Sequence, residues 1–329
     1  MIWALIAAQA LQAPVAVTNP NCAGSLADLQ SALERIAAVP VGEVGIAVID
    51  ESCNRTISVN GDRRFPMVST VKLAIAVYYL AEVDAGRRSL ATMIAVDDRL
   101  RLRADGITFF APYAGVSLSA ANLIHLMLTR SDSTATDALL AAIGGPAPVE
   151  AWIERNRIEG LRVDRPIGQL LLDRRGAVAA LGQTPAEAMR RWDPVAPGSA
   201  IVADPETDGV ANPVFDADPR DTATPLGYAR FLARLDRGEL IGAGSRALLL
   251  DVLSRTLTGS NRIKGLLPVT IRVEHKTGTL SGVTDDVGFI TLPDGRRVVI
   301  AVFARGGSER PTVIARAARA VYDRFVPAR

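Results

Sequence analysis

The chain has 329 residues, of which 49% are hydrophobic and 22% are charged. This length and composition are typical of a globular protein with a large buried core, and they exclude a disordered chain. The 37 Lys and Arg residues nearly balance the 35 Asp and Glu residues, leaving a net charge of +2. Because the two signs are mixed along the sequence, nothing favours a nucleic-acid or anionic-membrane partner.

The N-terminus is apolar from Ile2 to Ala16 but too short to span a bilayer as a helix. Its small residues suit a signal peptidase, so residues 1–16 are predicted to be a secretory signal peptide, although no Lys or Arg precedes them. The alternative is a buried first helix. We expect the mature protein to begin between Ala10 and Cys22, to be periplasmic or secreted, and to have no membrane anchor after cleavage.

Two cysteines and two histidines limit the chemistry. Neither Cys22 nor Cys53 lies in a CxxC pair or near a histidine, so we expect no metal and no cofactor. In an exported chain these cysteines are predicted to form a disulfide, with two unpaired thiols as the alternative. Neither His125 nor His275 has an orienting partner in the sequence, which argues against a Ser-His-Asp triad. The base for any hydrolysis must then be a lysine or a carboxylate.

The predicted strands lie near the two ends of the chain, and most of the predicted helices lie between them. Hydrophobic spacing predicts helices over residues 25–38, 69–84, 118–128, 134–143, 148–157, 225–235, 245–253 and 311–325. Residues 166–219 have the composition of an irregular segment. Strands are predicted over residues 44–50, 56–60, 271–276, 287–292 and 297–303. Strands at both ends predict one sheet built from both termini, against which the helical middle packs as a second lobe.

The first motif that carries chemistry is Ser69-Thr70-Val71-Lys72. A serine and a lysine three residues apart at the start of a helix lie on one face. A buried lysine there can lose its proton and activate the serine as a nucleophile. Alone, the pattern is common and usually marks an ordinary helix start.

Two further motifs follow in the chain. Residues 131–133 read Ser-Asp-Ser between two predicted helices, and residues 276–279 read Lys-Thr-Gly-Thr at the end of a predicted strand. Glycine lets a ligand approach the strand closely, and lysine and threonine suit a carboxylate. The ordered set Ser-x-x-Lys, Ser-Asp-x and Lys-Thr-Gly is typical of class A β-lactamases and penicillin-binding proteins.

The sequence resembles the class A β-lactamase family over roughly residues 25–328. Further matching segments are residues 65–68 before the serine, 220–225, 262–268, 286–288 and 292–295. The resemblance implies an α/β (α+β) fold, a five-stranded antiparallel sheet flanked by helices plus an all-helical lobe. It implies one catalytic domain over residues 22–329, with the α/β lobe at about 22–65 and 255–329. The helical lobe would span about 69–254 and include an extended omega-loop region at 166–219.

The resemblance also implies the reacting groups. Ser69 resembles the serine that is acylated, and Lys72 the lysine that activates it. Ser131 resembles the serine that relays a proton to the β-lactam nitrogen. Lys276 would support Ser131 electrostatically.

The binding groups follow from the same resemblance. Backbone N–H groups of Ser69 and Thr279 would form an oxyanion hole, worth about 3–4 kcal/mol per donor. Gly278 would allow close approach, while Thr277 and Arg262 would hold the substrate carboxylate. For Arg262 the alternative is a plain surface arginine.

The sequence departs from the family at two places. Ser133 stands where members usually have an asparagine that binds the substrate's side-chain amide, and serine has a shorter reach and one donor proton. After Val163-Asp164-Arg165, which resembles the opening of the omega loop, no glutamate follows at the family spacing. A long irregular loop is normally functional or disordered.

The deacylating base is therefore sought elsewhere in the loop. Counting back from Arg220 by the family spacing places the family asparagine at Asn212 and the glutamate at Asp208. Asp193 competes because its neighbours resemble the local sequence around the family glutamate, and Glu206 is a third candidate. The alternative is that all three acids are solvated loop residues.

The sequence thus predicts a serine β-lactamase, a hydrolase of cyclic amides that acts on a small-molecule β-lactam as a monomer. A related D-alanyl peptidase or esterase is one alternative. A binding or sensor protein that is acylated and then turns over slowly is another. The sequence does not rank penicillins, cephalosporins and carbapenems.

Overall fold

The central element of the computed structural model, which describes residues 25–39, 42–102, 106–190 and 212–326, is a five-stranded antiparallel sheet. Its order is β2 (Arg55–Val59), β1 (Glu43–Asp50), β9 (Arg297–Arg305), β8 (Val283–Thr291) and β7 (Arg272–Leu280). The predicted sheet, built from both ends of the chain, is confirmed.

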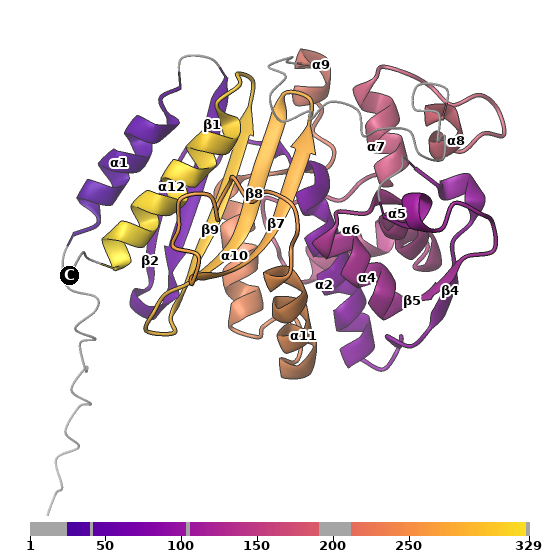
Figure 1. The fold of residues 1–329 in the computed structure, drawn as a ribbon, viewed down its shortest axis with the longest axis horizontal. Coiled ribbons are helices and arrows are strands. Elements are labelled where there is room, and N and C mark those ends of the chain that lie inside the picture. The colour runs from indigo at the N-terminus through magenta and orange to yellow at the C-terminus, as the bar shows by residue number, and fades with distance from the viewer. Residues whose placement is uncertain (1–24, 40–41, 103–105, 191–211, 327–329) are drawn as a thin grey trace, which may run out of the picture.

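Helices cover both faces of this sheet. Helices α1 (Ala27–Ala37) and α12 (Arg310–Phe325) pack together on one face, in front of the sheet in Figure 1. Leu29 and Leu33 of α1 are buried in the same cluster as Ile46, Ile300 and Val302 of the strands, because helical and strand periodicity each present one apolar face. Helix α10 (Pro225–Asp236) packs on β1 and β9, and α11 (Ala243–Ser254) packs on β7.

The helical lobe is built around α2 (Val71–Asp84), which is buried at residues 71–80 and at Glu82. Around it lie α4 (Ala120–Thr129), α5 (Ser133–Ala142), α6 (Ala147–Arg155) and α11 (Figure 1). The remaining short elements are α3 (Ile107–Phe110), η4 (Asp98–Leu100), the pair β4 (Met93–Ala95) and β5 (Ser117–Ser119), and the pair β3 (Phe65–Pro66) and β6 (Thr222–Ala223). Helix α2 is apolar on nearly all sides, and a helix of this kind must be surrounded by other elements.

Several predicted boundaries are wrong. The helix expected from Ser69 is a 3-10 turn, η3 (Val68–Thr70), followed by α2. The helix expected from residue 118 begins as strand β5, because these residues pair with β4. The strand expected to end at Lys276 runs on to Leu280, because every residue of 272–280 has a partner on β8. Tertiary pairing overrode local propensity in the last two cases.

The segment expected to be irregular over 166–219 contains three short helices within its described part. These are α7 (Ile167–Arg174), α8 (Pro185–Met189) and α9 (Pro213–Asp216). Helix α8 has a capping box between Thr184 and Glu187, which is a readable sequence signal. Helix α9 begins with Pro213 after its cap Asn212.

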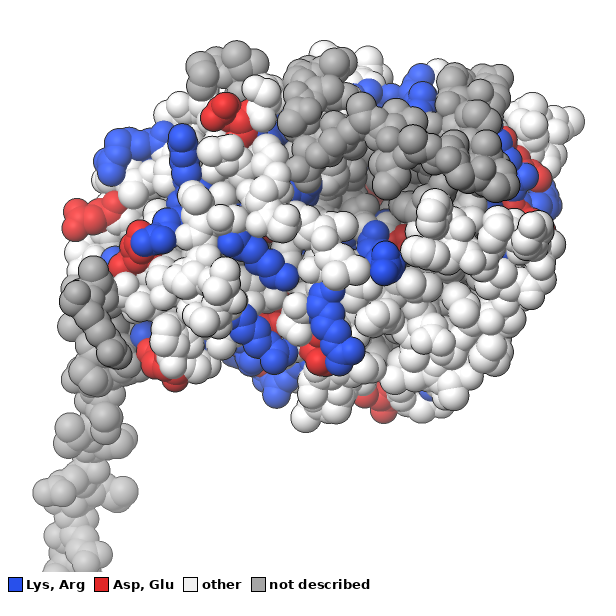
Figure 2. Space-filling view, in the orientation of Figure 1, with Lys and Arg blue, Asp and Glu red and all other residues white. Residues whose placement is uncertain are grey.

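Several predicted features lie outside the described residues, namely the signal peptide, Cys22, Asp193, Glu206 and Asp208. Cys53, the last residue of the 3-10 turn η2 (Glu51–Cys53), is not a free cysteine. In the described ranges no helix has both the length and the apolar character to cross a membrane. Figure 2 shows basic and acidic side chains scattered over one face, in keeping with the balanced charge of the sequence.

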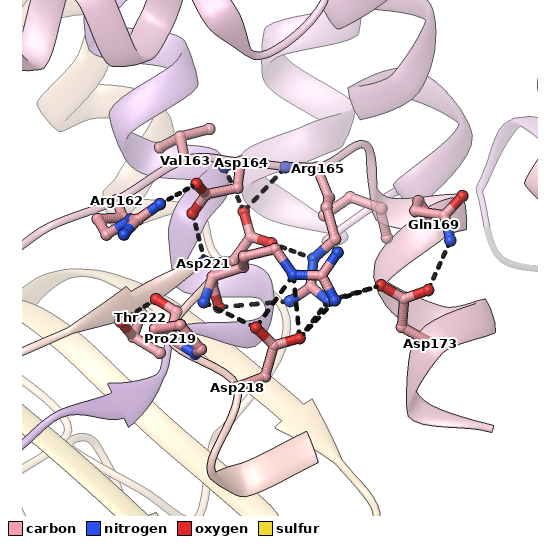
Figure 3. A network of polar contacts seen from close by, with 12 residues as sticks. Arg162, Val163, Asp164, Arg165, Gln169, Asp173, Asp218, Pro219, Asp221 and Thr222 are labelled. Carbon is pink, nitrogen blue, oxygen red and sulfur yellow. Dashed lines mark hydrogen bonds and ion pairs between the residues drawn. The ribbon is translucent and has the colours of Figure 1, made fainter. Parts of the chain in front are cut away.

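A buried ion-pair network joins the two ends of the omega-loop region, residues 166–219 (Figure 3). The Arg165 side chain is only 4% exposed and contacts Asp221 at 2.5 Å, Asp173 at 2.7 Å and Asp218 at 2.9 Å. Asp221 also accepts backbone N–H bonds from Asp164 at 2.7 Å and Arg165 at 3.1 Å. Burial raises the pKa of Asp221, while its backbone and side-chain hydrogen bonds act in the opposite direction. The two ends of the segment are thereby held together.

Replacing Arg165 with methionine should therefore destabilise the fold. The substitution leaves the buried Asp221 carboxylate without its ion-pair partner, for which we expect a loss of about 3–5 kcal/mol in the free energy of unfolding. Urea unfolding of the two proteins measures the difference.

The matched control is Arg220→Met. Arg220 pairs with Asp218 and Asp173 of the same network, but its side chain is 46% exposed. An exposed pair contributes about 0–1 kcal/mol, so this variant should stay near wild type. Equal losses in the two variants would contradict a special role for the buried arginine.

Candidate active site

Ser69 lies in η3, between the sheet and the start of α2, and is partly exposed. The residue before it, Val68, has φ of 46°, a strained conformation for a β-branched residue. Thr70 holds the turn by donating from its backbone N and its Oγ1 to the Met67 carbonyl oxygen at 2.8 and 2.7 Å. Tyr228 donates its hydroxyl to the Thr70 carbonyl oxygen at 2.8 Å. The serine is thus presented by a turn that its surroundings hold in place.

Two fully buried lysines converge on Ser131. Lys72 Nζ donates to the Ser131 carbonyl oxygen at 2.5 Å, to Ser131 Oγ at 3.3 Å and to Ser133 Oγ at 3.2 Å. Lys276 Nζ donates to Ser131 Oγ at 2.9 Å and to the Thr277 carbonyl oxygen at 2.7 Å. A hydroxyl oxygen that accepts from both ammonium groups keeps its own proton for donation to a third group. Of the five residues predicted to react or relay, the structure therefore joins Lys72, Ser131 and Lys276 by hydrogen bonds. Ser69 precedes Lys72 by three residues, and Asp208 lies outside the described residues.

The charge of this cluster is its main electrostatic feature. Burial, and then the neighbouring charge of Lys72, hold the pKa of Lys276 well below its ordinary value, although Asp286 acts in the opposite direction. Two ammonium groups this close favour release of one proton. A neutral lysine is the kind of base that a nucleophilic serine requires.

Asp132, the middle residue of the second motif, has a structural role. It caps α5 by accepting the N–H of Ala135 at 2.7 Å and also accepts the N–H of Ile107 at 2.6 Å. Burial raises its pKa, and the hydrogen bonds act against this. The carboxylate fixes the chain between Ser131, whose φ is 58°, and Ser133. The Ser-Asp-Ser sequence before a helix was a readable capping signal.

The third motif lies inside β7, where Gly278 pairs with Asp285 of β8. A Cβ atom on Gly278 would lie 2.9 Å from Asp285 Oδ2 and 3.0 Å from the Met67 carbonyl oxygen. Only glycine therefore lets η3 pack directly against the strand. Strand β7, which also contains Thr279, thus packs against the turn that carries Ser69.

Arg262 is 1% exposed, so the alternative of a plain surface arginine is wrong. Its Nη1 donates to the carbonyl oxygens of Gly278 at 2.9 Å and Asp285 at 2.8 Å, and its Nη2 contacts Thr279 Oγ1. Thr277 is also buried. The guanidinium thus supports the strand around Gly278 and adds positive charge beside the third motif.

His275 has an orienting partner that the sequence analysis missed. Its Nδ1 lies 2.8 Å from Asp286 Oδ1, and both side chains are fully buried. Its Nε2 has no hydrogen-bond partner among the described residues, so no serine completes a triad there. The pair stabilises the junction of β7 with Ile263, whose N–H donates to Asp286 at 3.1 Å. The prediction that a lysine replaces histidine as base is compatible with this geometry.

Asp137 on α5 is a second residue that the sequence analysis missed. Its carboxylate accepts the N–H groups of Ile167 at 2.7 Å and Gly168 at 2.8 Å, the first turn of α7. Burial raises its pKa to about 6, and the two backbone hydrogen bonds act in the opposite direction. The carboxylate caps a helix that is distant in sequence, so no local signal reveals it.

Asn212, at the position expected for the family asparagine, lies within the described residues. It accepts the N–H of Phe215 at 3.1 Å and donates Nδ2 to the Arg174 carbonyl oxygen at 2.9 Å. Asp208, Asp193 and Glu206 lie outside the described residues.

Comparison with known proteins assigns the family. A family model described as "Beta-lactamase enzyme family" matches residues 28–325. The chain belongs to this family. Extended-spectrum beta-lactamase PER-1 of Pseudomonas aeruginosa is 27% identical over 306 residues, covering 88% of this chain and 86% of PER-1. Beta-lactamase CTX-M-8 of Citrobacter amalonaticus is 27% identical over 304 residues, covering 91% and 89% of the two chains.

Solved structures agree with the β-lactamase assignment. The ancestral class A beta-lactamase GNCA matches with a TM-score of 0.69 and 30% identity, covering 90% of this chain and 98% of that chain. A mutant of PBP-A, in an acyl-enzyme complex with penicillin G, matches in fold with a TM-score of 0.71 at 23% identity, covering 91% and 97% of the two chains. The expected fold class and the resemblance to class A β-lactamases are both confirmed.

The close contact at Gly278 generates a testable prediction. In Gly278→Ala the new methyl group must displace Asp285 or the turn before Ser69, and overpacking of this kind costs about 1–3 kcal/mol. We expect a loss of that size in the free energy of unfolding, measured by urea denaturation.

Gly244→Ala is the matched control. Gly244 is an exposed residue of α11, and a Cβ atom there would meet nothing within 4 Å. Alanine is favoured over glycine in a helix by roughly 0.5–1 kcal/mol, so this variant should equal or exceed wild-type stability. A Gly278→Ala protein as stable as the control would refute the packing argument.

Proposed function

We propose that the protein is a serine β-lactamase that hydrolyses the lactam amide through an acyl-enzyme on Ser69. The observation that carries the proposal is the convergence of Lys72 and Lys276 on Ser131, next to a partly exposed serine on a strained turn. Membership of the β-lactamase family and the names of its relatives support the substrate class. No cofactor enters the proposal.

The proposed acylation has two stages, attack by Ser69 and cleavage of the lactam bond, and each stage includes a proton transfer. Neutral Lys72 takes the proton of Ser69, and the Ser69 oxygen attacks the lactam carbonyl carbon. The oxyanion that forms is stabilised by the N–H groups of Ser69 and Thr279. The carbon–nitrogen bond then breaks as Ser131 gives its proton to the nitrogen and recovers one from the lysine pair. Lys276 stabilises the negative charge that develops on Ser131 during this relay.

We propose that the substrate carboxylate binds beside Thr277, attracted by the charges of Lys276 and Arg262. The expectation that Gly278 admits the ligand does not enter this proposal, because Asp285 and the Met67 carbonyl oxygen fill the space beside it. Ser133 is proposed to bind the substrate's side-chain amide through its short hydroxyl. Because Ser133 Oγ already accepts a hydrogen bond from Lys72 Nζ, it has one donor proton for this purpose.

The first test is covalent labelling. After exposure to a penicillin, the intact mass of the wild-type protein should rise by one ligand mass, and Ser69→Ala should show no rise, because the attacking oxygen is gone. Ser117→Ala, an exposed serine of β5, serves as the control and should be labelled like wild type. An adduct retained in Ser69→Ala would overturn the assignment of the nucleophile.

Deacylation requires a base for the attacking water, and we propose Asp208, with Asp193 and Glu206 as competitors. Aspartate is one methylene shorter than glutamate, and a misplacement of ~1 Å can cost roughly a hundredfold in rate. We therefore expect slow deacylation unless the loop backbone moves inward.

The test of this base is pre-steady-state kinetics of Asp208→Asn and Asp193→Asn. Loss of a general base typically costs about a hundred- to ten-thousandfold in rate. We expect acyl-enzyme to accumulate in Asp208→Asn alone. Deacylation at the wild-type rate in Asp208→Asn would rule it out, and trapping in Asp193→Asn alone would transfer the role.

One observation favours a second candidate, a protein that is acylated and then turns over slowly, or a related D-alanyl peptidase or esterase. Soon after Arg165, where the family has its glutamate, the chain instead has Pro166 and the buried Ile167. A burst of one equivalent without turnover would favour the slow acylated protein. Turnover of a peptide ending in D-Ala-D-Ala would favour the peptidase.

We also propose that the protein is exported and acts as a monomer in the periplasm or outside the cell. The apolar N-terminus supports cleavage of residues 1–16. A disulfide between Cys22 and Cys53 would then form in an oxidising compartment, which is consistent with Cys53 not being free. The catalytic domain would span residues 22–329, with its lobes as expected from the sequence.

A further inference from the structure

Three arginines line a small cavity beside α10 that the proposed chemistry does not use. Arg157 lies in the turn after α6, and Arg230 and Arg234 lie on α10. The cavity has a volume of about 100 Å³. That is more than the about 30 Å³ of one water molecule and less than the about 300–1,000 Å³ of a pocket for a drug-sized ligand. Its occupant is therefore a small ion or the end group of a larger molecule.

The cavity lies where the turn after α6 packs directly on α10. A Cβ atom on Gly227 of α10 would lie 2.6 Å from the Glu159 carbonyl oxygen, so only glycine allows this contact. Arg234 Nη1 donates to the carbonyl oxygens of Asn156 at 2.7 Å and Arg157 at 3.4 Å. Two backbone segments fixed to each other thus define the cavity. A ligand would find it already formed, which lowers the cost of ordering on binding.

The charge of the lining indicates the kind of ligand. Its ionisable side chains are the three arginines and Glu159, so positive charge exceeds negative charge. Arg234 is already paired with Glu239 at 2.9 Å. The guanidinium groups of Arg157 and Arg230 are exposed, and neither has a hydrogen-bond or ion-pair partner among the residues that the structure describes. Two cationic groups at one small cavity repel each other, and an anion between them would remove this repulsion.

We infer that this cavity binds a phosphoryl group, as inorganic phosphate or as the end of a phosphomonoester, through Arg157 and Arg230. The planar guanidinium fork matches two oxygens of a phosphate. A phosphoryl group has three acceptor oxygens and a charge of about −1.5 to −2 near pH 7, so it can serve two guanidinium groups at once. A carboxylate has only two oxygens and one charge. The inference is independent of the proposed β-lactam chemistry.

The experiment is isothermal titration calorimetry of the full chain near pH 7 with inorganic phosphate and, separately, with glycerol 3-phosphate. Sodium chloride keeps the ionic strength constant, so that screening does not vary. We expect saturable binding with a Kd on the order of 1 mM or tighter. Tighter binding of inorganic phosphate would identify the free ion as the ligand, and tighter binding of the ester would identify an end group.

The decisive variant is Arg230→Gln, which removes an exposed charge that supports no other contact among the described residues. It should weaken binding about tenfold or more, the value of one charge-assisted hydrogen bond. Thermal unfolding without phosphate checks that the variant keeps the wild-type fold.

Arg155→Gln is the matched control. Arg155 is exposed and ends α6, two positions before Arg157, but it does not line the cavity. This variant should change the Kd by less than about twofold, because an exposed charge outside the cavity is screened. Absence of saturable heat with both ligands in the wild-type protein overturns the inference. Binding that Arg230→Gln leaves unchanged, or that both variants weaken equally, belongs elsewhere on the protein and also overturns it.

Discussion

The two buried ammonium groups of Lys72 and Lys276 are the constraint on which the site depends. Neither side chain reaches solvent, so each charge must be solvated by the protein itself. The groups that do so include the hydroxyl and carbonyl oxygens of Ser131 and the hydroxyl of Ser133. Lys72 comes from the central helix of one lobe and Lys276 from the edge strand of the sheet. Satisfying their charges therefore requires the lobes to meet at Ser131.

Mutual repulsion gives this cluster its chemical character. A single buried lysine would keep its proton if a carboxylate paired with it, whereas two lysines that share a serine disfavour holding two charges. Burial is the main cause of the lowered pKa of Lys276, and the charge of Lys72 lowers it further. The same contact that joins the lobes therefore favours the loss of one proton from the lysine pair. Stability and reactivity are thus opposed at this point, because a carboxylate here would relieve the repulsion and remove the base.

Two residues of the site have a strained backbone conformation. Val68 and Ser131 both have positive φ, although neither is glycine, and each lies beside or within a motif. Tyr228 and Asp132 hold these turns from behind through hydrogen bonds to the chain. Strain of this kind persists only where the surrounding structure determines it. The serines are therefore positioned before a ligand arrives, and less ordering remains to be done on binding.

The omega-loop region, residues 166–219, shows how a site can tolerate a change of loop length. Its two ends are joined by Arg165 and Asp221, so residues between them are added to a closed loop, and closure costs only slightly more as a loop lengthens. Asp137 fixes the first turn of α7, and Asn212 fixes the return. A segment anchored at both ends in this way can change its interior without moving the lysine cluster. The place soon after Arg165 where the family has its glutamate lies in the anchored start, because Asp137 holds the N–H of Ile167 there.

The sequence by itself predicted the sheet built from both termini, the class of the site and the motifs that contain Lys72, Ser131 and Lys276, because periodicity and motif spacing are local properties. Spacing at a helix start put Ser69 near Lys72 whether that turn was 3-10 or α. What only the tertiary structure decided were contacts between distant segments. Those include His275 with Asp286, Asp137 with α7, the burial of Arg262, and the extension of β7 through Gly278. Each depends on which strand or helix packs beside the residue, and a hydrogen bond across the fold leaves no periodic trace in the chain.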